Sequence, residues 1–180
     1  MKTQNAENKQ IICYWFVART RRNQELSVQK RIESFGIENF VPTRSEVRVY
    51  GKRKRMVQKV LIPNVVFMHT GKEQAYSLIN DEGLNISFVI DKSTRKTLVV
   101  PEKQMHDFMR VCTAGTAETV QLSTETFAKG DTVQIVEGDF CGVEGELIRH
   151  KGKSHVLIHI HGVVALTVQI DKKFLKKLNA

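Results

Sequence analysis

Apolar positions in the first part of the chain change period several times, and each change predicts a new element. Residues 11–18 form a short apolar and aromatic run, which is typical of a buried strand. Residues 22–35 follow a helical spacing, and Gly36 is suited to end that helix. Residues 37–49 and 56–68 return to strand-like patterns, so the chain changes from strand to helix and back to strand.

The pattern continues to alternate between helix and strand up to residue 112. Residues 72–80 predict a short helix and residues 86–90 a strand. Pro101 is suited to the first turn of a helix that runs to about Cys112, with Met105, Phe108 and Met109 facing inward. This order of elements predicts an α+β sandwich with an antiparallel sheet.

A stretch of small, polar and Thr-rich residues, 113–128, interrupts the periodic pattern. Its composition favours a linker. The chain is therefore divided into a flexible tail (1–10), an N-terminal domain (11–112), the linker (113–128) and a C-terminal domain (129–180).

The C-terminal domain opens with a glycine-punctuated motif. Val133 and Ile135 alternate as on a half-buried strand, and the glycines that follow allow a tight turn with positive φ. Phe140 lies between two of these glycines, where we expect it to fill the end of a small barrel. The run resembles the KOW motif of small SH3-like barrels, although Asp139 stands where that motif usually has proline. The residues that carry the resemblance are Val133, Ile135, Gly138, Phe140, Gly142 and Gly145.

Composition narrows the class of protein. The chain has 180 residues and a formal net charge of +9, an excess that favours a polyanionic partner such as nucleic acid. Its three cysteines form no CxxC pair, which argues against a zinc site or a disulfide framework. The polar N-terminus has no apolar signal region, and no apolar run approaches the roughly 18 residues of a membrane span. We expect a cytoplasmic protein that makes no membrane contact.

The sequence offers no candidate for catalysis. It lacks a Ser-His-Asp, HExxH, P-loop or paired-carboxylate pattern. The acidic residues Asp81, Glu82, Glu144 and Glu146 are too scattered to suggest a metal-dependent nuclease. His155, His159 and His161 alternate along a predicted strand, but no carboxylate or thiol accompanies them at ligand spacing. We therefore expect neither an enzyme nor a metal or other cofactor.

Two further segments extend the resemblance to most of the chain. Trp15-Phe16-Val17 opens the first strand before a basic helix, and Ile62-Pro63-Asn64-Val65-Val66-Phe67 enters a later strand after a charged hairpin. Together with the KOW-like run they resemble the NusG family of transcription elongation factors over residues 11–180. The IPNVVF segment and residues 162–168 are most similar to the UpxY branch, the antiterminators of capsular polysaccharide operons.

The resemblance implies that the N-terminal domain docks on the clamp helices of the RNA polymerase β′ subunit and reaches across to the β lobe. The docking residues implied are Trp15, Phe16, Ile62, Pro63, Val65 and Phe67. Alternation along the strand places Val66 and Met68 in the core and Phe67 on the opposite face, which we expect to be exposed. The alternative is that the docking residues are ordinary core.

The resemblance also implies contact with upstream DNA, with the non-template strand or with nascent RNA. The basic residues implied are Arg19, Arg21, Arg22, Lys30, Arg31, Arg48, Lys52, Arg53, Lys54 and Arg55. Phosphate neutralisation by such residues gives affinity without reading sequence. A charged hairpin tip that is merely solvated is the alternative.

The expected function is that of a monomeric NusG-like factor that suppresses pausing or termination by RNA polymerase, in specific polysaccharide operons. By the same resemblance, the KOW barrel would recruit a ribosomal protein or a termination factor. Two alternatives stay open: a housekeeping NusG, and a ribosomal or RNA-binding KOW protein without polymerase contact.

Overall fold

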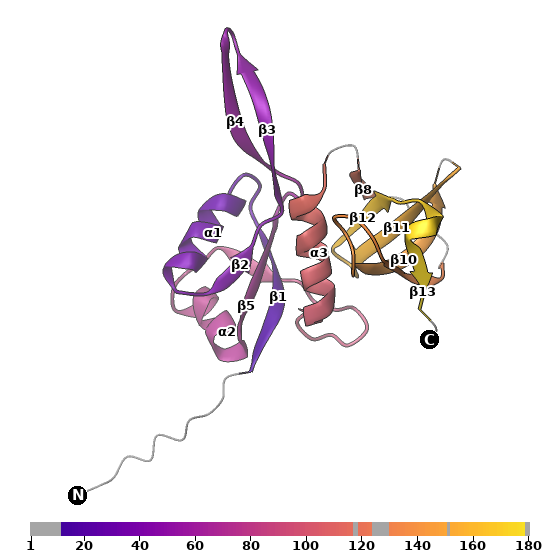
Figure 1. Ribbon diagram of the computed structural model, residues 1–180. Coiled ribbons are helices and arrows are strands. Elements are labelled where there is room, and N and C mark those ends of the chain that lie inside the picture. The colour runs from indigo at the N-terminus through magenta and orange to yellow at the C-terminus, as the bar shows by residue number, and fades with distance from the viewer. Residues whose placement is uncertain (1–11, 117–118, 124–129, 151, 179–180) are drawn as a thin grey trace, which may run out of the picture.

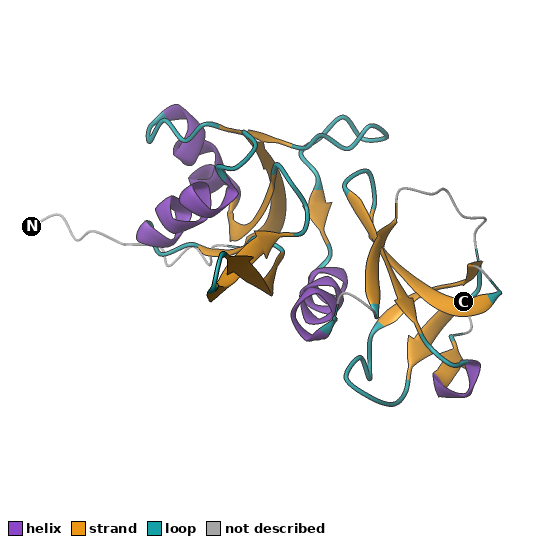
Figure 2. Cartoon of the chain, turned by 90° about the horizontal axis from the view of Figure 1, so that it is seen from above, coloured by secondary structure: helices purple, strands orange, loops and turns teal. Residues whose placement is uncertain are grey.

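A computed structural model of the chain describes residues 12–116, 119–123, 130–150 and 152–178; the tail predicted over residues 1–10 lies outside them. Figure 1 shows an N-terminal α/β part, a long hairpin that projects from it, and a C-terminal β part. One helix, α3 (Glu102–Ala114), lies between the two parts in both views (Figures 1 and 2).

The N-terminal part is built on an antiparallel sheet with strand order β2-β5-β1-β6, in which β7 also pairs with β1. Its strands are β1 (Cys13–Thr20), β2 (Glu38–Phe40), β5 (Val65–Gly71), β6 (Ile86–Phe88) and β7 (Val99–Val100). The central pair, β1 and β5, places Val17 opposite Phe67 and Phe16 opposite Met68. The predicted antiparallel α/β character is confirmed.

Helices cover both faces of this sheet. Phe16 and Met68 belong to one apolar cluster with Ile32 of α1 (Glu25–Ser34) and Leu78 of α2 (Lys72–Asn80). Residues one position along each strand point the other way, and they cluster with residues of α3. Alternation therefore sorted the strand residues correctly between two faces, but the expectation that one face is free is wrong, because α3 covers it.

Strands β3 (Thr43–Tyr50) and β4 (Arg53–Val60) form a separate two-stranded ribbon. It is the hairpin that extends from the top of the molecule in Figure 1. Gly51, at the turn, has a φ of +61°, which glycine adopts without steric cost. The charged residues of the predicted hairpin tip thus lie on the turn and on the first part of β4.

The C-terminal part is a six-stranded antiparallel sheet with order β13-β9-β10-β11-β12-β8. Its elements are β8 (Val120–Ser123), β9 (Thr132–Ile135), β10 (Glu144–His150), β11 (Lys153–Ile160), β12 (Val164–Gln169), β13 (Leu175–Lys177) and the short 3₁₀ helix η1 (Lys172–Phe174). Val133 and Ile135 on β9 are buried, as their alternation predicted.

The stretch expected to be a linker contains regular structure. Thr113 and Ala114 complete α3, and β8 pairs with β12 so that Val120 lies opposite Val168. Gly115 allows this return, because a Cβ there would lie 2.2 Å from a methyl carbon of Val120. The sequence pattern missed β8 because the strand is short and its partner lies far along the chain; residues 117–118 and 124–128 are outside the described part.

The packing of α3 on the sheet gives a stability prediction. Phe67 is fully buried and its ring lies 5.4 Å from that of Phe108 on α3. Phe67→Ala leaves a cavity there and should lower the free energy of unfolding by about 3–5 kcal/mol. Met56→Ala is the control, because Met56 is 72% exposed on the hairpin and its loss should cost less than about 0.5 kcal/mol. Urea denaturation of both variants measures the difference, and equal midpoints would contradict this packing.

Candidate nucleic-acid and polymerase interface

Most of the residues implied in polymerase docking are buried. Trp15, Val65 and Phe67 lie on the sheet face beneath α3, and Ile62 joins the same apolar cluster. Phe16 lies on the opposite face, in the cluster beneath α1 and α2. The predicted exposed apolar patch is therefore wrong for this arrangement of the chain, whereas the docking role of these residues stays a prediction.

Pro63 differs from the other residues of that set, because it is exposed at the turn that leads into β5. The next residue, Asn64, has a φ of +66° and is held by three hydrogen bonds. Its backbone N–H donates to Glu25 Oε1 over 2.7 Å, its Nδ2 donates to the Thr20 carbonyl over 3.1 Å, and its carbonyl accepts from the Thr20 N–H over 3.0 Å. The buried carboxylate of Glu25 thus fixes this turn, a role that no local pattern in the sequence indicated.

A polar and aromatic cluster ties the first turn of α3 to the sheet. Glu102 Oε1 accepts from the indole N–H of Trp15 over 3.2 Å and lies 2.8 Å from His106 Nε2. The His69 ring stacks on Trp15 with centroids 5.0 Å apart, and His69 Nδ1 lies 2.9 Å from Glu38 Oε2. These contacts explain why Trp15 is buried although it carries a polar N–H.

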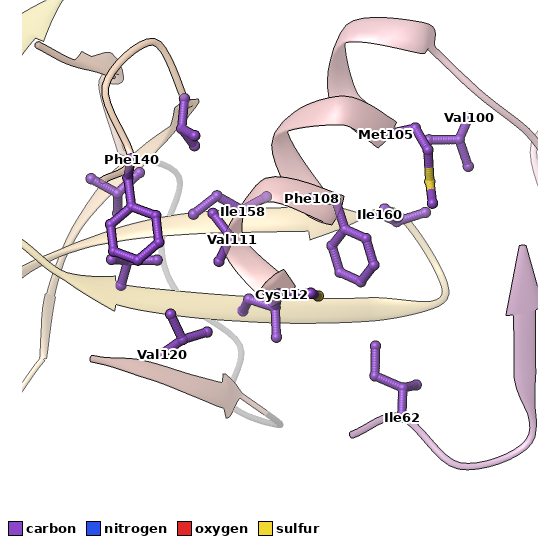
Figure 3. Close-up of a cluster of buried hydrophobic side chains, with 14 of the residues drawn as sticks. Ile62, Val100, Met105, Phe108, Val111, Cys112, Val120, Phe140, Ile158 and Ile160 are labelled. Atoms are coloured by element: carbon purple, nitrogen blue, oxygen red, sulfur yellow. The ribbon is translucent and has the colours of Figure 1, made fainter. Parts of the chain in front are cut away.

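The outer side of α3 bonds to the C-terminal part through polar side chains. Gln104 Nε2 donates to the His159 carbonyl over 2.6 Å, and Arg110 Nη1 donates to the Cys141 carbonyl over 2.6 Å. Asp107 Oδ2 accepts from the Glu144 N–H over 3.1 Å. Val111, next to these groups, is buried in the same apolar cluster as Phe140 and Ile158 (Figure 3). A hollow of about 300 Å³, lined by Gln104, Asp107 and Glu144 among others, remains between the two parts.

The basic residues around the first helix are exposed. They are Arg19, Arg21, Arg22, Lys30 and Arg31. Arg19 and Arg21 line a hollow of about 240 Å³ together with Asn85 and Ser87. Arg31 donates to the Glu82 carbonyl, so this side chain also ties α1 to the loop after α2.

The second basic group lies on the hairpin, and Arg19 of the first group lies near the base of the hairpin. Arg19 pairs with Val65, which follows the base of the hairpin by a short loop. On the ribbon, Arg48 lies opposite Arg55 and Val49 lies opposite Lys54. The five cations of this group are exposed: Arg48, Lys52, Arg53, Lys54 and Arg55.

The KOW-like residues take two different structural roles. Gly138 and Gly142 have φ values of +82° and +90°, as expected in the tight turn, and Phe140 between them is buried. Gly145 instead lies within β10, where a Cβ would lie 2.5 Å from the Leu157 carbonyl oxygen of the neighbouring strand. The expectation that Gly145 belongs to the turn is therefore wrong: its small size allows close approach of two strands.

The C-terminal histidines are not equivalent. His155 is buried on β11, and this burial lowers its pKa because the charged form is desolvated. His155 and His159 share one face of β11, as alternation predicted, with His159 half-buried, whereas His161 lies beyond the end of the strand. Within the described ranges, no group of three His, Cys, Asp or Glu side chains is placed to hold a metal ion.

Comparison with known proteins identifies the family. Residues 13–109, which contain the N-terminal sheet, the hairpin and most of α3, match the family described as transcription termination factor NusG. The chain belongs to the NusG family, whose members are non-enzymatic transcription factors. No curated protein matches the chain. In the described parts of the chain, no helix is both long and apolar enough to cross a membrane.

Solved structures include similar chains. A structure of Thermotoga maritima NusG that concerns its domain interaction has 20% sequence identity and a TM-score of 0.48, and the match covers 93% of this chain and 98% of that one. Two conformations of an MjSpt4:Spt5 complex have 15% identity. Conformation A has a TM-score of 0.27, and the match covers 91% of this chain and 97% of that one. Conformation B has a TM-score of 0.28, and the match covers 92% of this chain and 97% of that one.

Cys112 lies on α3 and is buried, so its reactivity with a thiol reagent reports whether α3 stays packed. Burial raises the pKa of the Cys112 thiol to about 12, so near the ordinary thiol pKa of about 8.5 it remains protonated and unreactive. A thiol reagent near that pH should modify the exposed Cys13 and Cys141 in the folded protein, and Cys112 only in urea. Mass spectrometry of the labelled peptides counts the modified thiols. Equal labelling rates at all three cysteines without urea would show that α3 leaves its site readily.

Proposed function

We propose that the protein is a NusG-like elongation and antitermination factor that docks on the RNA polymerase clamp, bridges the cleft and suppresses pausing or termination. The observation that carries the proposal is the family match over residues 13–109. The family places the protein in transcription. The polymerase contact and the effect on pausing are inferred from what the family resemblance implies.

The nucleic-acid contact is assigned to the two basic groups, around the first helix and on the hairpin. Both groups are exposed, and Arg19 of the first group lies at the end of β1 opposite Val65, close to the base of the hairpin, so the two groups could contact one strand of non-template DNA or nascent RNA. Such contacts neutralise phosphates and give affinity that falls as salt rises. They position the factor without reading the sequence.

The polymerase contact is assigned to the sheet face that carries Trp15, Ile62, Val65 and Phe67, with Pro63 at its edge. Because these apolar side chains lie beneath α3, docking through them requires α3 to leave both the sheet and the C-terminal part, so the bonds between α3 and the C-terminal part oppose docking. The polymerase would then bind a minor open state and increase its population, since it interacts with that state alone. Phe16, which packs beneath α1 and α2, is assigned a supporting role in the core of the domain.

The C-terminal part is assigned as a KOW domain of the SH3-like type. The positive-φ glycines around the buried Phe140 support this assignment. Its partner would be a ribosomal protein or a termination factor. The hydrogen bonds that this part makes to α3 imply that such a partner also favours the open state if it covers the turn around Cys141 and Gly142.

We assign the protein to the UpxY type, acting in polysaccharide operons as a monomer. The alternatives are a housekeeping NusG and an RNA-binding KOW protein without polymerase contact. Genome-wide occupancy separates the first two, because a specialised factor should be found on few operons and a housekeeping factor on most transcribed genes. Absence of binding to purified polymerase would favour the third.

The central test is transcription in vitro with RNA polymerase purified from the same organism. On a template that carries a polysaccharide operon leader, the protein should increase the fraction of transcripts that read through terminators and shorten the duration of pauses. An unrelated leader is the control for operon specificity. Unchanged pausing on both templates at saturating protein would contradict the proposal.

The covered docking face predicts that weakening the α3 interface strengthens polymerase binding. Asp107→Ala with Arg110→Ala removes two side-chain bonds to the C-terminal part, each worth about 0.5–1.5 kcal/mol. A shift of about 1.4 kcal/mol towards the open state should raise the apparent affinity for polymerase about tenfold, if the closed state predominates. Binding is measured with labelled protein and core polymerase.

The control for that variant is Arg149→Ala with Asp171→Ala. It makes the same change in charge on the C-terminal part, where the side chains of Arg149 and Asp171 are exposed. Its affinity should equal that of the unmodified protein. Weaker binding by the interface variant would instead place the polymerase contact on α3 or on the C-terminal part.

A further inference from the structure

The two faces of the β3–β4 hairpin differ in chemistry. Residues directly opposite each other in an antiparallel pair share a face, and so do residues two apart along a strand. Tyr50 lies opposite Arg53 and Arg48 lies opposite Arg55, so these four side chains share one face. The other face carries Val47, Val49, Met56 and Lys54, of which only Lys54 is charged.

The arginine face concentrates positive charge without an acidic partner at the tip. Like charges directly opposite each other destabilise a strand pair, and Arg48 and Arg55 are such a pair. The ribbon has a single carboxylate, Glu46, which forms a 2.9 Å ion pair with Lys59 towards the base. Among the ion pairs formed by the described residues, none includes Arg48, Arg53 or Arg55. An anionic ligand would relieve this repulsion.

An exposed aromatic ring lies among these arginines. Tyr50 is 55% exposed, and with Arg53, Arg55 and Val57 it lines a shallow hollow of about 330 Å³. Stacking on a nucleobase gives a tyrosine ring at such a position an apolar partner, while guanidinium groups beside it reach the phosphates. The combination of a stacking platform and a basic groove is typical of proteins that bind single strands.

A single strand suits this face better than a duplex. In a duplex the faces of the bases are stacked on each other, so a protein side chain reaches only phosphates, sugars and base edges. Tyr50 would then add little to the affinity for a duplex, and Lys54 on the opposite face could contact a phosphate as well as Arg55. A single strand offers unstacked bases to Tyr50 and phosphates to the three arginines at the same time.

We propose that this face of the hairpin is a binding site for single-stranded nucleic acid, in which one base stacks on Tyr50 and Arg48, Arg53 and Arg55 hold the flanking phosphates. The inference deepens the nucleic-acid contact of the proposed function and rests on it for its role in transcription. The site itself requires no polymerase, so it can be tested on the protein alone.

The test measures binding of the full-length protein to a fluorescent oligothymidylate and to a duplex of the same length, by anisotropy over a range of salt. Tyr50→Ala should weaken binding of the single strand about 5- to 150-fold, the effect of losing one stacked base, and change duplex binding little. Tyr50→Phe keeps the ring and should restore most of the affinity. Unchanged urea midpoints show that the variants are folded.

A charge-matched pair tests the face. Arg55→Gln and Lys54→Gln remove one positive charge each from adjacent residues on opposite faces. Arg55→Gln should lower the magnitude of the slope of log K against log salt by about 0.7, the value for one phosphate contact on a single strand. Lys54→Gln should leave the slope unchanged.

Three results would overturn the proposal. They are absence of single-strand binding at low salt, wild-type affinity in Tyr50→Ala, and equal slopes for the Arg55 and Lys54 variants. The last would indicate a solvated basic tip that attracts any polyanion. Polymerase binding is measured separately and does not depend on these results. Loss of single-strand binding with normal polymerase binding would therefore overturn this site alone and leave the proposed function standing.

Discussion

The packing of α3 between the N-terminal sheet and the C-terminal part is the contact on which the rest of the structure depends. On one side Phe108 packs against Phe67, with ring centroids 5.4 Å apart. On the other side Gln104, Asp107 and Arg110 bond to backbone groups of the C-terminal part. The apolar residues of both sides belong to one continuous buried cluster, so α3 cannot leave either side without exposing apolar surface.

The two contacts of α3 differ in how readily they can be exchanged. Separating Phe67 from Phe108 would expose large aromatic surface, which is costly in water. The outer contact combines apolar packing of Val111 with hydrogen bonds to backbone groups, and the bond from Arg110 to the Cys141 carbonyl is exposed, so water can replace that partner. The outer contact is therefore the one that a binding partner could displace at lower cost, and any regulation of the covered face would act there first.

The hairpin follows the opposite principle. It projects from the N-terminal part, and its Arg48, Arg53 and Arg55 form no ion pair with the described residues. Its shape is set by its own cross-strand register and not by a core. This member of the NusG family therefore has a covered apolar surface beneath α3 and an open basic surface on the hairpin. Two surfaces of such different chemistry suit two different partners.

Local sequence patterns determined much of this protein. Alternation placed Val65 and Phe67 on one strand face and Val66 and Met68 on the other, because side-chain direction in a strand depends only on the strand's own backbone. The helices, the charged hairpin and the buried Phe140 followed from similarly local signals.

Only the tertiary structure decided what covers each face. That α3 lies over Phe67, that β8 returns to pair with β12, and that Glu25 holds Asn64 all depend on segments far apart in the sequence. Gly145 is the same case, since its small size matters only because the Leu157 carbonyl lies against it. A periodic pattern reports which residues share a face, but the partner of that face is chosen by the packing of the whole chain, and this is why the sequence alone predicted an exposed patch where the structure has a core.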